Sequence, residues 1–514
     1  MICSSSKAIH VLDDDSLLNI FTFCRPLRSN EDEAIDRNTH KLPGEEWSHR
    51  ERWWYSLTHV CQRWRRLIFE SASYLRICLV CTYGTPVADM LARSPVMPVV
   101  VDYADETRGL TVEGEEGLRF ALLPERRDRV CRIRLLIRQP YLWRFAAALF
   151  GGNFPRLEYL FIKLQERSSA SSSLKLPDTF RAHRLRHLVL THFGFLLASP
   201  ILSASVHLVT LSLNMVAYCL PNDLLERLSF LPRLETLHIA SISSILEDVG
   251  TAWGQAPHWQ TPLDTHVTLS NLHSFVFEGN SAYLKVLLPR MATPLLRGLQ
   301  TAFLNQMVSS VSCLLSCTTT ADDLNLSFGS AWFRFHHRGV SARMCPCDGD
   351  RKYVFSLHAF CRGLEPQLSF VSQLFDGPSP LLAPVVDLSL DYSRRILPSE
   401  PHDDSEDRRT QWHNLLRSFR NVEILRVHDE LSRDISRSLL LGSEGEPLSP
   451  SRVLLPRLKE LQCTATGDTP DAGNAFAAFI DARGAAGHPV RLVQATVPVL
   501  PPTSTGISSR AYQS

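Results

Sequence analysis

The sequence predicts an α/β protein in which an N-terminal helical domain is followed by an irregular solenoid with a parallel sheet. Three observations lead to this prediction. Two amphipathic helical stripes open the chain, a short leucine-based strand pattern then recurs along most of it, and a proline-arginine-leucine run-in precedes three of the recurrences. Apolar residues at steps of three and four mark one face of a helix, whereas alternation marks a strand. The order of the two patterns places the helices before the repeats.

The segment VLDDDSLLNIFTFC at 11–24 predicts the first helix. Asp13, Asp14 and Asp15 lie where the start of a helix favours capping oxygens and negative charge. The apolar stripe consists of Leu17, Ile20, Phe21 and Cys24.

The segment ERWWYSLTHVCQRWRRLIFESASYLRICLVC at 51–81 predicts a second helical stripe that stops abruptly before a strand. Arg63, Arg65 and Arg66 fall on the opposite face of that helix. Periodicity alone favours an ordinary core helix. The stripe consists of Trp53, Leu57, Val60, Cys61, Trp64, Leu67 and Ile68.

Together these two segments resemble the F-box family. The family pattern is a leucine and proline, an acidic residue, paired leucines, an isoleucine-phenylalanine step, and a valine-cysteine followed by a spaced tryptophan. In this chain Asp13 stands in the place of the proline, and a charged insert at 25–50 separates the helices by more than the family spacing. The resemblance is closest to F-box proteins of mushroom-forming fungi, in which such an insert is common. The matching residues are Leu12, Asp15, Leu17, Leu18, Ile20, Phe21, Val60, Cys61 and Trp64.

The resemblance implies a substrate-recognition adaptor of a Skp/cullin/F-box ubiquitin ligase, within the ubiquitin-like conjugation pathway. The F-box would bind a Skp-family adaptor and through it a cullin, while the repeats would bind an unknown protein substrate. No cofactor and no catalytic residue are implied, and the location is the cytoplasm or the nucleus. Some of the matching residues must instead hold the helices together. The expected adaptor-binding residues are Leu12, Leu17, Leu18, Ile20, Phe21, Val60, Cys61, Trp64, Leu67 and Ile68.

Beyond residue 75 the chain repeats a pattern of three leucine-like residues in which the second and third are separated by one position. A unit of this kind cannot bury its own apolar face and needs stacked neighbours. The first five starts are separated by 28, 23, 26 and 38 residues, so the first three intervals fit leucine-rich repeats. The units are LEYLFI at 157–162, LRHLVL at 185–190, LVTLSL at 208–213, LETLHI at 234–239, LHSFVF at 272–277, VDLSL at 386–390, VEILRV at 422–427 and LKELQC at 458–463.

The domain organisation follows from these patterns. A helical domain spans 8–72, a degenerate leucine-rich-repeat array spans 73–465, and a capping helix with a disordered tail spans 466–514. Strands are expected at 75–83, 98–103 and 129–137, and short outer helices at 85–95 and 221–231. Because no linker separates the first two parts, they should move as one body.

The second half of the array is less regular. Residues 328–364 break the leucine pattern, and 397–411 are predicted to form a polar, charged loop. After 465 the leucine pattern stops, a last helix is expected within AGNAFAAFIDARGAAG, and the proline- and serine-rich end predicts disorder.

Composition is that of an ordinary globular chain. It has 514 residues, of which 44% are hydrophobic and 21% charged, and its 54 basic and 53 acidic residues nearly cancel. This balance argues against a general nucleic-acid or anionic-membrane surface. No apolar run approaches the roughly 20 residues of a membrane span, and the N-terminus lacks a signal-peptide core. The scattered cysteines, 13 in all, indicate a reducing compartment.

Motifs with catalytic or metal chemistry are weak. His336, His337, Cys345, Cys347 and Asp348 are zinc-type ligands, but their spacing matches no standard module, so a surface loop is the simpler interpretation. The CxxC of Cys78 and Cys81 lies in an expected strand, where the two thiols would point to opposite faces. No phosphate loop, nucleophile elbow or HExxH helix occurs. The sequence therefore favours an interaction protein over an enzyme.

A second interpretation stays open: a leucine-rich-repeat scaffold without a ligase connection, whose first helices only cap the array. In either case we expect partner contact on the strand-lined face or its edge loops, at exposed positions such as Glu158, Arg186, Thr210 and Glu235. The 25–50 insert is not expected to take part.

Overall fold

The computed structural model describes most of the chain and divides into two compact units, 1–218 with 501–514, and 219–500. Its helices and mostly parallel strands form a mixed α/β architecture. The described residues are 12–26, 51–94, 96–104, 112–165, 179–214, 219–240, 265–279, 281–303, 328–337, 339–346, 355–361, 363–374, 382–393, 406–440, 454–465 and 475–496.

In its described residues, the first unit begins with the three helices α2, α5 and α6 and continues as alternating strands and helices. Within it the strands run parallel in chain order, β1-β2-β3-β4-β5-β6. The elements are α2 (Asp14–Phe23), α5 (Tyr55–Thr58), α6 (Gln62–Glu70), β1 (Leu79–Cys81), α7 (Val87–Arg93), β2 (Val99–Tyr103), α8 (Val112–Ala121), the 3-10 helix η1 (Pro124–Arg129), β3 (Val130–Ile137), α9 (Gln139–Phe150), β4 (Tyr159–Leu164), β5 (His187–Thr191), α10 (Phe195–Ser203) and β6 (Thr210–Asn214).

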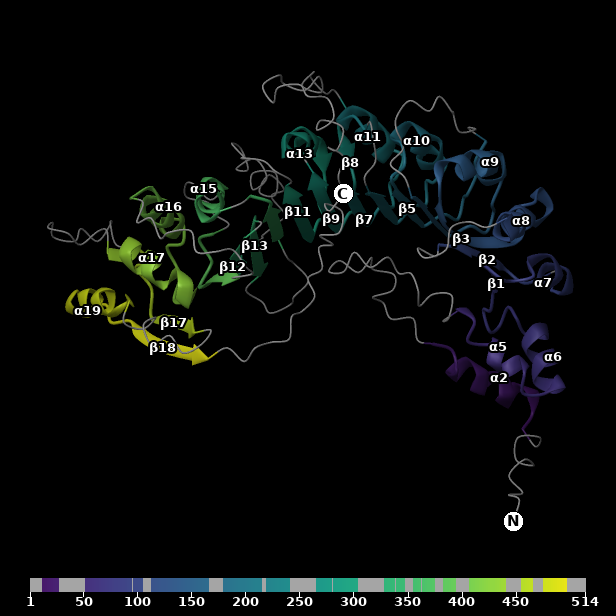
Figure 1. The fold of residues 1–514 in the computed structure, drawn as a ribbon, viewed down its shortest axis with the longest axis horizontal. Coiled ribbons are helices and arrows are strands. Elements are labelled where there is room, and N and C mark those ends of the chain that lie inside the picture. Colours follow the sequence, from purple (N-terminus) through teal and green to yellow (C-terminus); the bar gives the residue numbers. More distant parts are fainter. Residues whose placement is uncertain are drawn as a thin grey trace, which may run out of the picture. The chain divides into compact units, whose positions relative to one another are not determined.

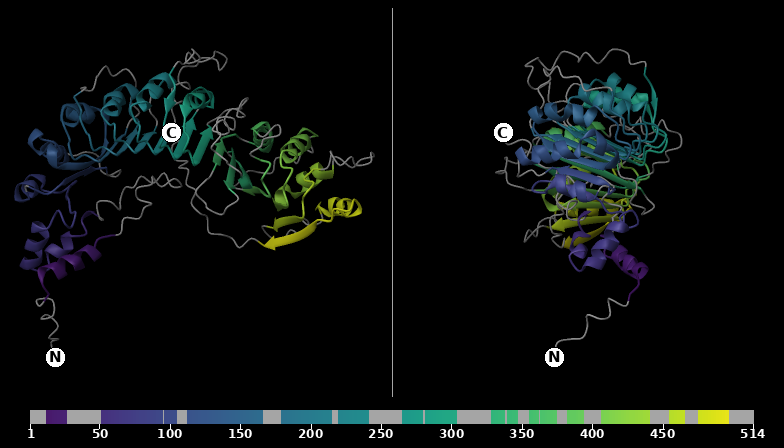
Figure 2. Two further views of the ribbon diagram at one scale, coloured as in Figure 1. Left: turned by 180° about the vertical axis from the view of Figure 1, so that it is seen from behind. Right: turned by 90° about the vertical axis from the view of Figure 1, so that its right-hand side faces the viewer.

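Helices α7 to α10 lie along one face of the β1–β6 sheet (Figure 1), and the view from behind in Figure 2 shows the same layering. Alternate strand residues such as Leu160, Ile162 and Leu190 are fully buried. A Cβ at Gly117 of α8 would meet the hydroxyl of Tyr103 in β2, so this set of alternate residues faces the helices. The other set, including Tyr159 and Phe161, lies on the opposite face.

Several strands of the parallel sheet follow a buried leucine that lies in a turn, and each of these strands begins two residues after that leucine. The N–H of Leu157 donates to the Phe154 carbonyl at 3.2 Å, and β4 begins at Tyr159. The carbonyl of Glu158 then accepts hydrogen bonds from Arg186 N–H at 2.9 Å and His187 N–H at 3.0 Å. The same backbone pattern recurs at 185–187 and 234–236. Strands are present at all eight expected leucine-pattern units, and each starts two residues later than expected except that at 386–390, which starts at Asp387.

The second unit contains both parallel and antiparallel strands. Its strand order is β7-β9-β11-β14-β13-β12-β15-β16-β17-β18, with β8 and β10 forming a separate parallel pair. The elements are α11 (Pro221–Leu228), β7 (Thr236–Ala240), β8 (Val267–Thr268), β9 (Ser274–Gly279), α13 (Ser281–Leu287), the 3-10 helix η3 (Leu288–Arg290), β10 (Met291–Ala292), β11 (Gly298–Phe303), β12 (Phe328–His336), β13 (Gly339–Pro346), β14 (Phe355–Ala359), α15 (Leu364–Leu374), β15 (Asp387–Ser393), α16 (Glu406–Arg417), β16 (Ile424–His428), α17 (Asp429–Leu440), β17 (Glu460–Ala465), α19 (Ala477–Ala485) and β18 (Arg491–Thr496).

The structure corrects the prediction of an irregular surface loop within 328–364. This region holds β12, β13 and β14, of which β13 pairs antiparallel with both of the others. Strand β14 runs parallel to β11, and β12 runs parallel to β15, so the meander lies within the sheet. Burial alternates along β12, from Ala331 to Phe333 and Phe335, because phenylalanine and alanine take the inward positions that leucine takes in strands such as β5 and β6.

Three further expectations need adjustment. Thr210, expected to be exposed, is buried at the start of β6. Part of the predicted loop at 397–411 is helical, since α16 begins at Glu406. The expected last helix is present as α19, but it is followed by β18, which pairs in parallel with β17 and was not predicted.

Candidate functional site

The start of α2 shows the predicted acidic cap. Asp13 is the N-cap residue, and its Oδ1 accepts a hydrogen bond from Ser16 N–H at 2.7 Å. This bond lowers the pKa of the Asp13 carboxyl below its usual value. Asp14 and Asp15 occupy the first turn, where the helix dipole favours negative charge.

The second helical stripe is not continuous, which corrects the single helix expected from 53 to 68. Helix α5 ends at Thr58, and the chain is extended at Cys61, with a φ of −158°. The Cys61 sulfur then accepts a hydrogen bond from Trp64 N–H at 3.5 Å and caps α6. The interruption moves Val60 and Cys61 out of the helical stripe into the turn between the helices, because a capping residue takes a non-helical conformation.

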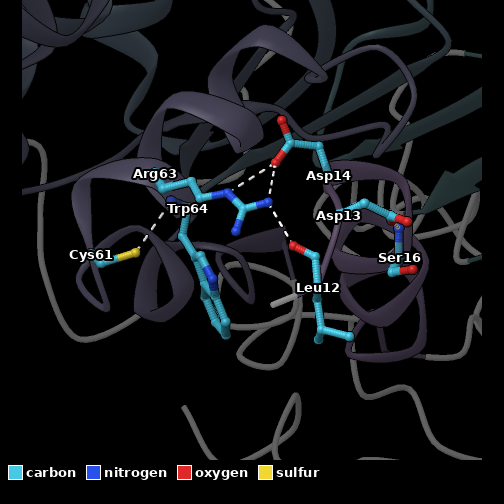
Figure 3. A network of polar contacts seen from close by, with 7 residues as sticks. All are labelled: Leu12, Asp13, Asp14, Ser16, Cys61, Arg63 and Trp64. Carbon is cyan, nitrogen blue, oxygen red and sulfur yellow. Dashed lines mark hydrogen bonds and ion pairs between the residues drawn. The ribbon is translucent and has the colours of Figure 1, made fainter. Parts of the chain in front are cut away.

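Arg63 joins the two predicted helical segments, although the sequence placed it on a solvent-facing side. Its Nη2 and Nε donate to Asp14 Oδ1 at 2.6 and 3.0 Å, and Nη2 also donates to the carbonyl of Leu12 at 2.7 Å. Figure 3 shows this network from Cys61 and Trp64 to Asp13 and Ser16. Arg63 thus fixes the start of α2 against the first turn of α6. The sequence signal for this contact was a basic residue on α6 and an acidic residue at the start of α2. Because the two are far apart in the chain, no local pattern indicated that they meet.

The interior of this helical module is small and aromatic. The rings of Phe21 and Trp64 meet edge to face with centroids 4.8 Å apart. Leu17, Phe21, Leu67 and Ile68 are buried. These four of the expected docking residues therefore hold the helices together and do not present a surface.

The remaining expected docking residues are accessible to different degrees. Ile20 is 41% exposed and Val60 is 55% exposed. The partly exposed ones are Leu12, Leu18, Cys61 and Trp64.

The expected docking residues include Ile20 but not the rest of an exposed apolar surface on α2. Phe23, which follows Ile20 by three residues, is 88% exposed, and Tyr74 is 57% exposed. The Tyr74 hydroxyl donates to Asn19 Oδ1 at 3.3 Å, which places Tyr74 beside α2. Because residues at i and i+3 are neighbours on a helix, we call Ile20, Phe23 and Tyr74 the α2 patch. The spacing of Ile20 and Phe23 was the sequence signal for it.

The helical module packs on the sheet of the first unit. Glu51 pairs with Arg132 of β3 at 2.5 Å, and both side chains are mostly buried. Trp54 is buried and meets Phe69 edge to face at 5.8 Å. Burial raises the pKa of Tyr55, which lies near Val80 of β1. These contacts attach the module to the strands that follow it.

Next to Arg132 lies a second, more buried pair on the same sheet face. Arg134 Nη1 lies 3.4 Å from Asp102 Oδ2, and both side chains are buried. The arginine Cζ also lies 5.8 Å from the centroid of Phe161. The desolvation cost of such a buried ion pair can exceed the attraction between its charges, so the pair is weak evidence for stability.

The cysteine and histidine candidates are placed as follows. Cys78 precedes β1 and lies 4.0 Å, sulfur to sulfur, from Cys131, while Cys81 is buried and burial raises its pKa to about 12. His336 and Cys345 lie on β12 and β13, and Cys347 and Asp348 fall outside the described residues. In the described part of the chain no group of three such side chains is placed to hold a metal ion.

No model of a known protein family matches the chain, and no curated protein matches it. Among the helices that the structure describes, none is both long and apolar enough to cross a membrane.

Proposed function

We propose that the chain is a substrate-recognition adaptor of a Skp/cullin/F-box ubiquitin ligase. In this role the helical module of α2, α5 and α6 is an F-box that binds a Skp-family adaptor. The parallel strand-helix units that follow are degenerate leucine-rich repeats that bind a protein substrate. The protein acts in the cytoplasm or nucleus and contributes no catalytic residue.

The α2 patch is the observation that carries the proposal. Ile20 and Phe23 of α2 and the neighbouring Tyr74 are exposed to solvent, so the packing of the module interior does not explain why these positions are apolar. Exposed clusters of this kind are typical of protein interaction sites. The patch lies on the same two segments that resemble the F-box, so the residue pattern and the exposed surface coincide.

The mechanism is one of positioning. A protein that holds both the substrate and the ligase core raises the effective concentration of a substrate lysine near the ubiquitin-charged enzyme. The attachment of the helical module to β1 and β3 through Tyr55 and Glu51 supports this role, because a rigid connection preserves the distance between the two bound partners.

Co-purification with a Skp-family adaptor tests the proposal. Changing exposed residues is preferable to changing Phe21 or Trp64, because those two rings pack against each other in the module interior. The Ile20→Ser, Phe23→Ser double variant should retain its fold and lose adaptor binding. Phe230→Ser, at an exposed phenylalanine beyond the end of α11, is the matched control and should bind normally. Unchanged adaptor binding by the double variant would contradict the proposed F-box.

One observation favours the alternative of a scaffold without a ligase connection. Strand β1 is the first strand in the sheet order, and the helical module packs next to it through Tyr55, which lies near Val80. A cap of this kind protects the edge of a repeat array. If the full-length chain fails to bind any Skp-family adaptor while remaining folded, the capping role is the better explanation.

A further inference from the structure

The face of β12 and β13 opposite α15 and α16 in the second unit carries an aromatic and cationic cluster. Phe333 and Phe335 of β12 stack edge to face on Phe419 and Trp412, which belong to the helix layer around α16. Because strand side chains alternate, Trp332 and Arg334 point to the opposite face. Arg343 of β13 is directly across from Trp332 in the antiparallel register and shares that face.

Two arginines on this face are neutralised by strand neighbours. Arg334 Nε donates to Asp391 Oδ2 of β15 at 2.8 Å. Arg426 of β16 pairs with Asp387 of β15 and donates through Nε to Gln462 Oε1 at 2.9 Å. These side chains form a fixed polar lattice across β12, β15, β16 and β17.

Arg343 differs from these two arginines. It is exposed, and among the residues that the structure describes it makes no ion pair. Its Cζ lies 5.5 Å from the centroid of the Trp332 ring, and that of Arg334 lies 4.4 Å from the same centroid. Trp332 is thus bordered by two guanidinium groups, of which only Arg334 has its charge compensated.

This geometry suits a carboxylate. A guanidinium that packs against an aromatic ring still has its N–H edge available for a bidentate bond to a carboxylate. The ring holds the arginine in place, so little side-chain entropy is lost when an acid binds. Ser356 faces Arg343 from β14, which adds a hydroxyl beside the cation.

We propose that Trp332 and Arg343 bind a glutamate or aspartate side chain of an extended peptide lying across β12 and β13. The inference deepens the proposed function and rests on it, since the peptide would be a segment of the captured substrate. Asp387 and Asp391 favour a peptide over a nucleic acid. They neutralise Arg426 and Arg334, so of these three arginines only Arg343 keeps an uncompensated charge, which suffices for one acidic side chain but not for a row of phosphates.

Fluorescence anisotropy with the full-length chain tests the proposal. The probe is a fluorescein-labelled peptide of alternating serine and glutamate, and its matched counterpart has glutamine in place of glutamate. The glutamate peptide should bind about tenfold more tightly than the glutamine peptide, and Arg343→Gln should remove that difference. Arg343→Lys should retain part of it, because charge remains while the planar fork is lost.

The matched control is Arg433→Gln, at an exposed arginine on α17 in the helix layer. This variant should bind the glutamate peptide as the unchanged chain does. Three results would overturn the proposal. The two peptides could bind the unchanged chain equally, or Arg343→Gln and Arg433→Gln could weaken binding of the glutamate peptide equally. The third is an oligothymidylate that binds through Arg343 more tightly than the glutamate peptide does.

A second measurement separates this inference from the proposed function. Arg343→Gln should leave co-purification with the Skp-family adaptor unchanged, and the Ile20→Ser, Phe23→Ser variant should leave peptide binding unchanged. Loss of peptide selectivity with the adaptor still bound concerns only the Trp332–Arg343 site. Failure to bind any adaptor, with peptide selectivity intact, concerns only the F-box.

Discussion

Arg63 and Asp14 are separated by 49 positions in the sequence, and their side chains meet at 2.6 Å. The arginine extends from the first turn of α6, and the aspartate opens α2. Their contact, together with the bond from Arg63 to the Leu12 carbonyl, determines how the two helices start beside each other. Since both side chains are partly exposed, water screens their attraction.

A double-mutant cycle measures this contact. Arg63→Ala and Asp14→Ala should each reduce the protection of α2 and α6 amides in native-state hydrogen exchange, and the double variant should lose less than the sum. The expected coupling is about 0.5 kcal/mol, as for other exposed pairs. Arg66→Ala and Glu70→Ala, whose charged atoms are 3.8 Å apart on the exposed face of α6, are the comparison pair and should show a smaller coupling.

Phe21 and Ile20 should separate the interior of the helical module from its surface. Phe21→Ala removes a fully buried ring against Trp64 and should cost about 3–5 kcal/mol of local stability. Ile20→Ser, at an exposed site, should change stability by no more than about 0.5 kcal/mol. Amide exchange of α2 and α6 gives both values. Similar losses at the two positions would show that the assigned interior is wrong.

Cys61 should act as a weak helix cap. Sulfur is a poor acceptor, and its hydrogen bond from Trp64 N–H is 3.5 Å long. Serine places a better acceptor at the same position, whereas alanine removes it. The α6 amides of Cys61→Ser should therefore be more protected than those of Cys61→Ala, by about 1 kcal/mol. Equal protection in the two variants would mean that the sulfur does not cap the helix.

His358 should make the second unit less stable in acid. Burial, followed by the neighbouring His336, lowers its pKa from 6.5 to about 3. The imidazole of His358 therefore takes up a proton more readily in the unfolded chain than in the folded one. The contribution of His358 to the free energy of unfolding is complete above about pH 6.5 and is lost as the pH falls towards 3. Urea unfolding followed by circular dichroism at pH 7.5 and pH 5 measures the effect.

His358→Phe is the informative variant for this effect. It retains a buried ring but cannot titrate, so its stability should fall less between the two pH values than that of the unchanged chain. His488→Phe, at an exposed histidine after α19, is the control and should leave the pH dependence unchanged. An identical pH dependence for His358→Phe and the unchanged chain would contradict the role of this group.

The sequence located most strands of the parallel sheet because their burial is local in origin. In LEYLFI and LRHLVL, alternate apolar residues mark the helix-facing side whatever the neighbouring repeat contains. The search for leucines failed where phenylalanine and alanine take the same positions, as at Ala331 and Phe333 in β12. It failed again at β18, whose RLVQAT segment has only one leucine. This segment forms a strand through its backbone pairing with β17, which the local sequence does not reveal.

In the candidate site, local pattern and tertiary contact contributed different things. The sequence by itself determined the capped start of α2 at Asp13 and the apolar character of both helical segments, since caps and periodicity involve residues a few positions apart. Only the tertiary structure decided that Phe21 is interior while Phe23 is exposed, that Arg63 reaches Asp14, and that Arg343 lies across from Trp332. Those relationships depend on how distant segments approach one another, and no local spacing encodes that distance.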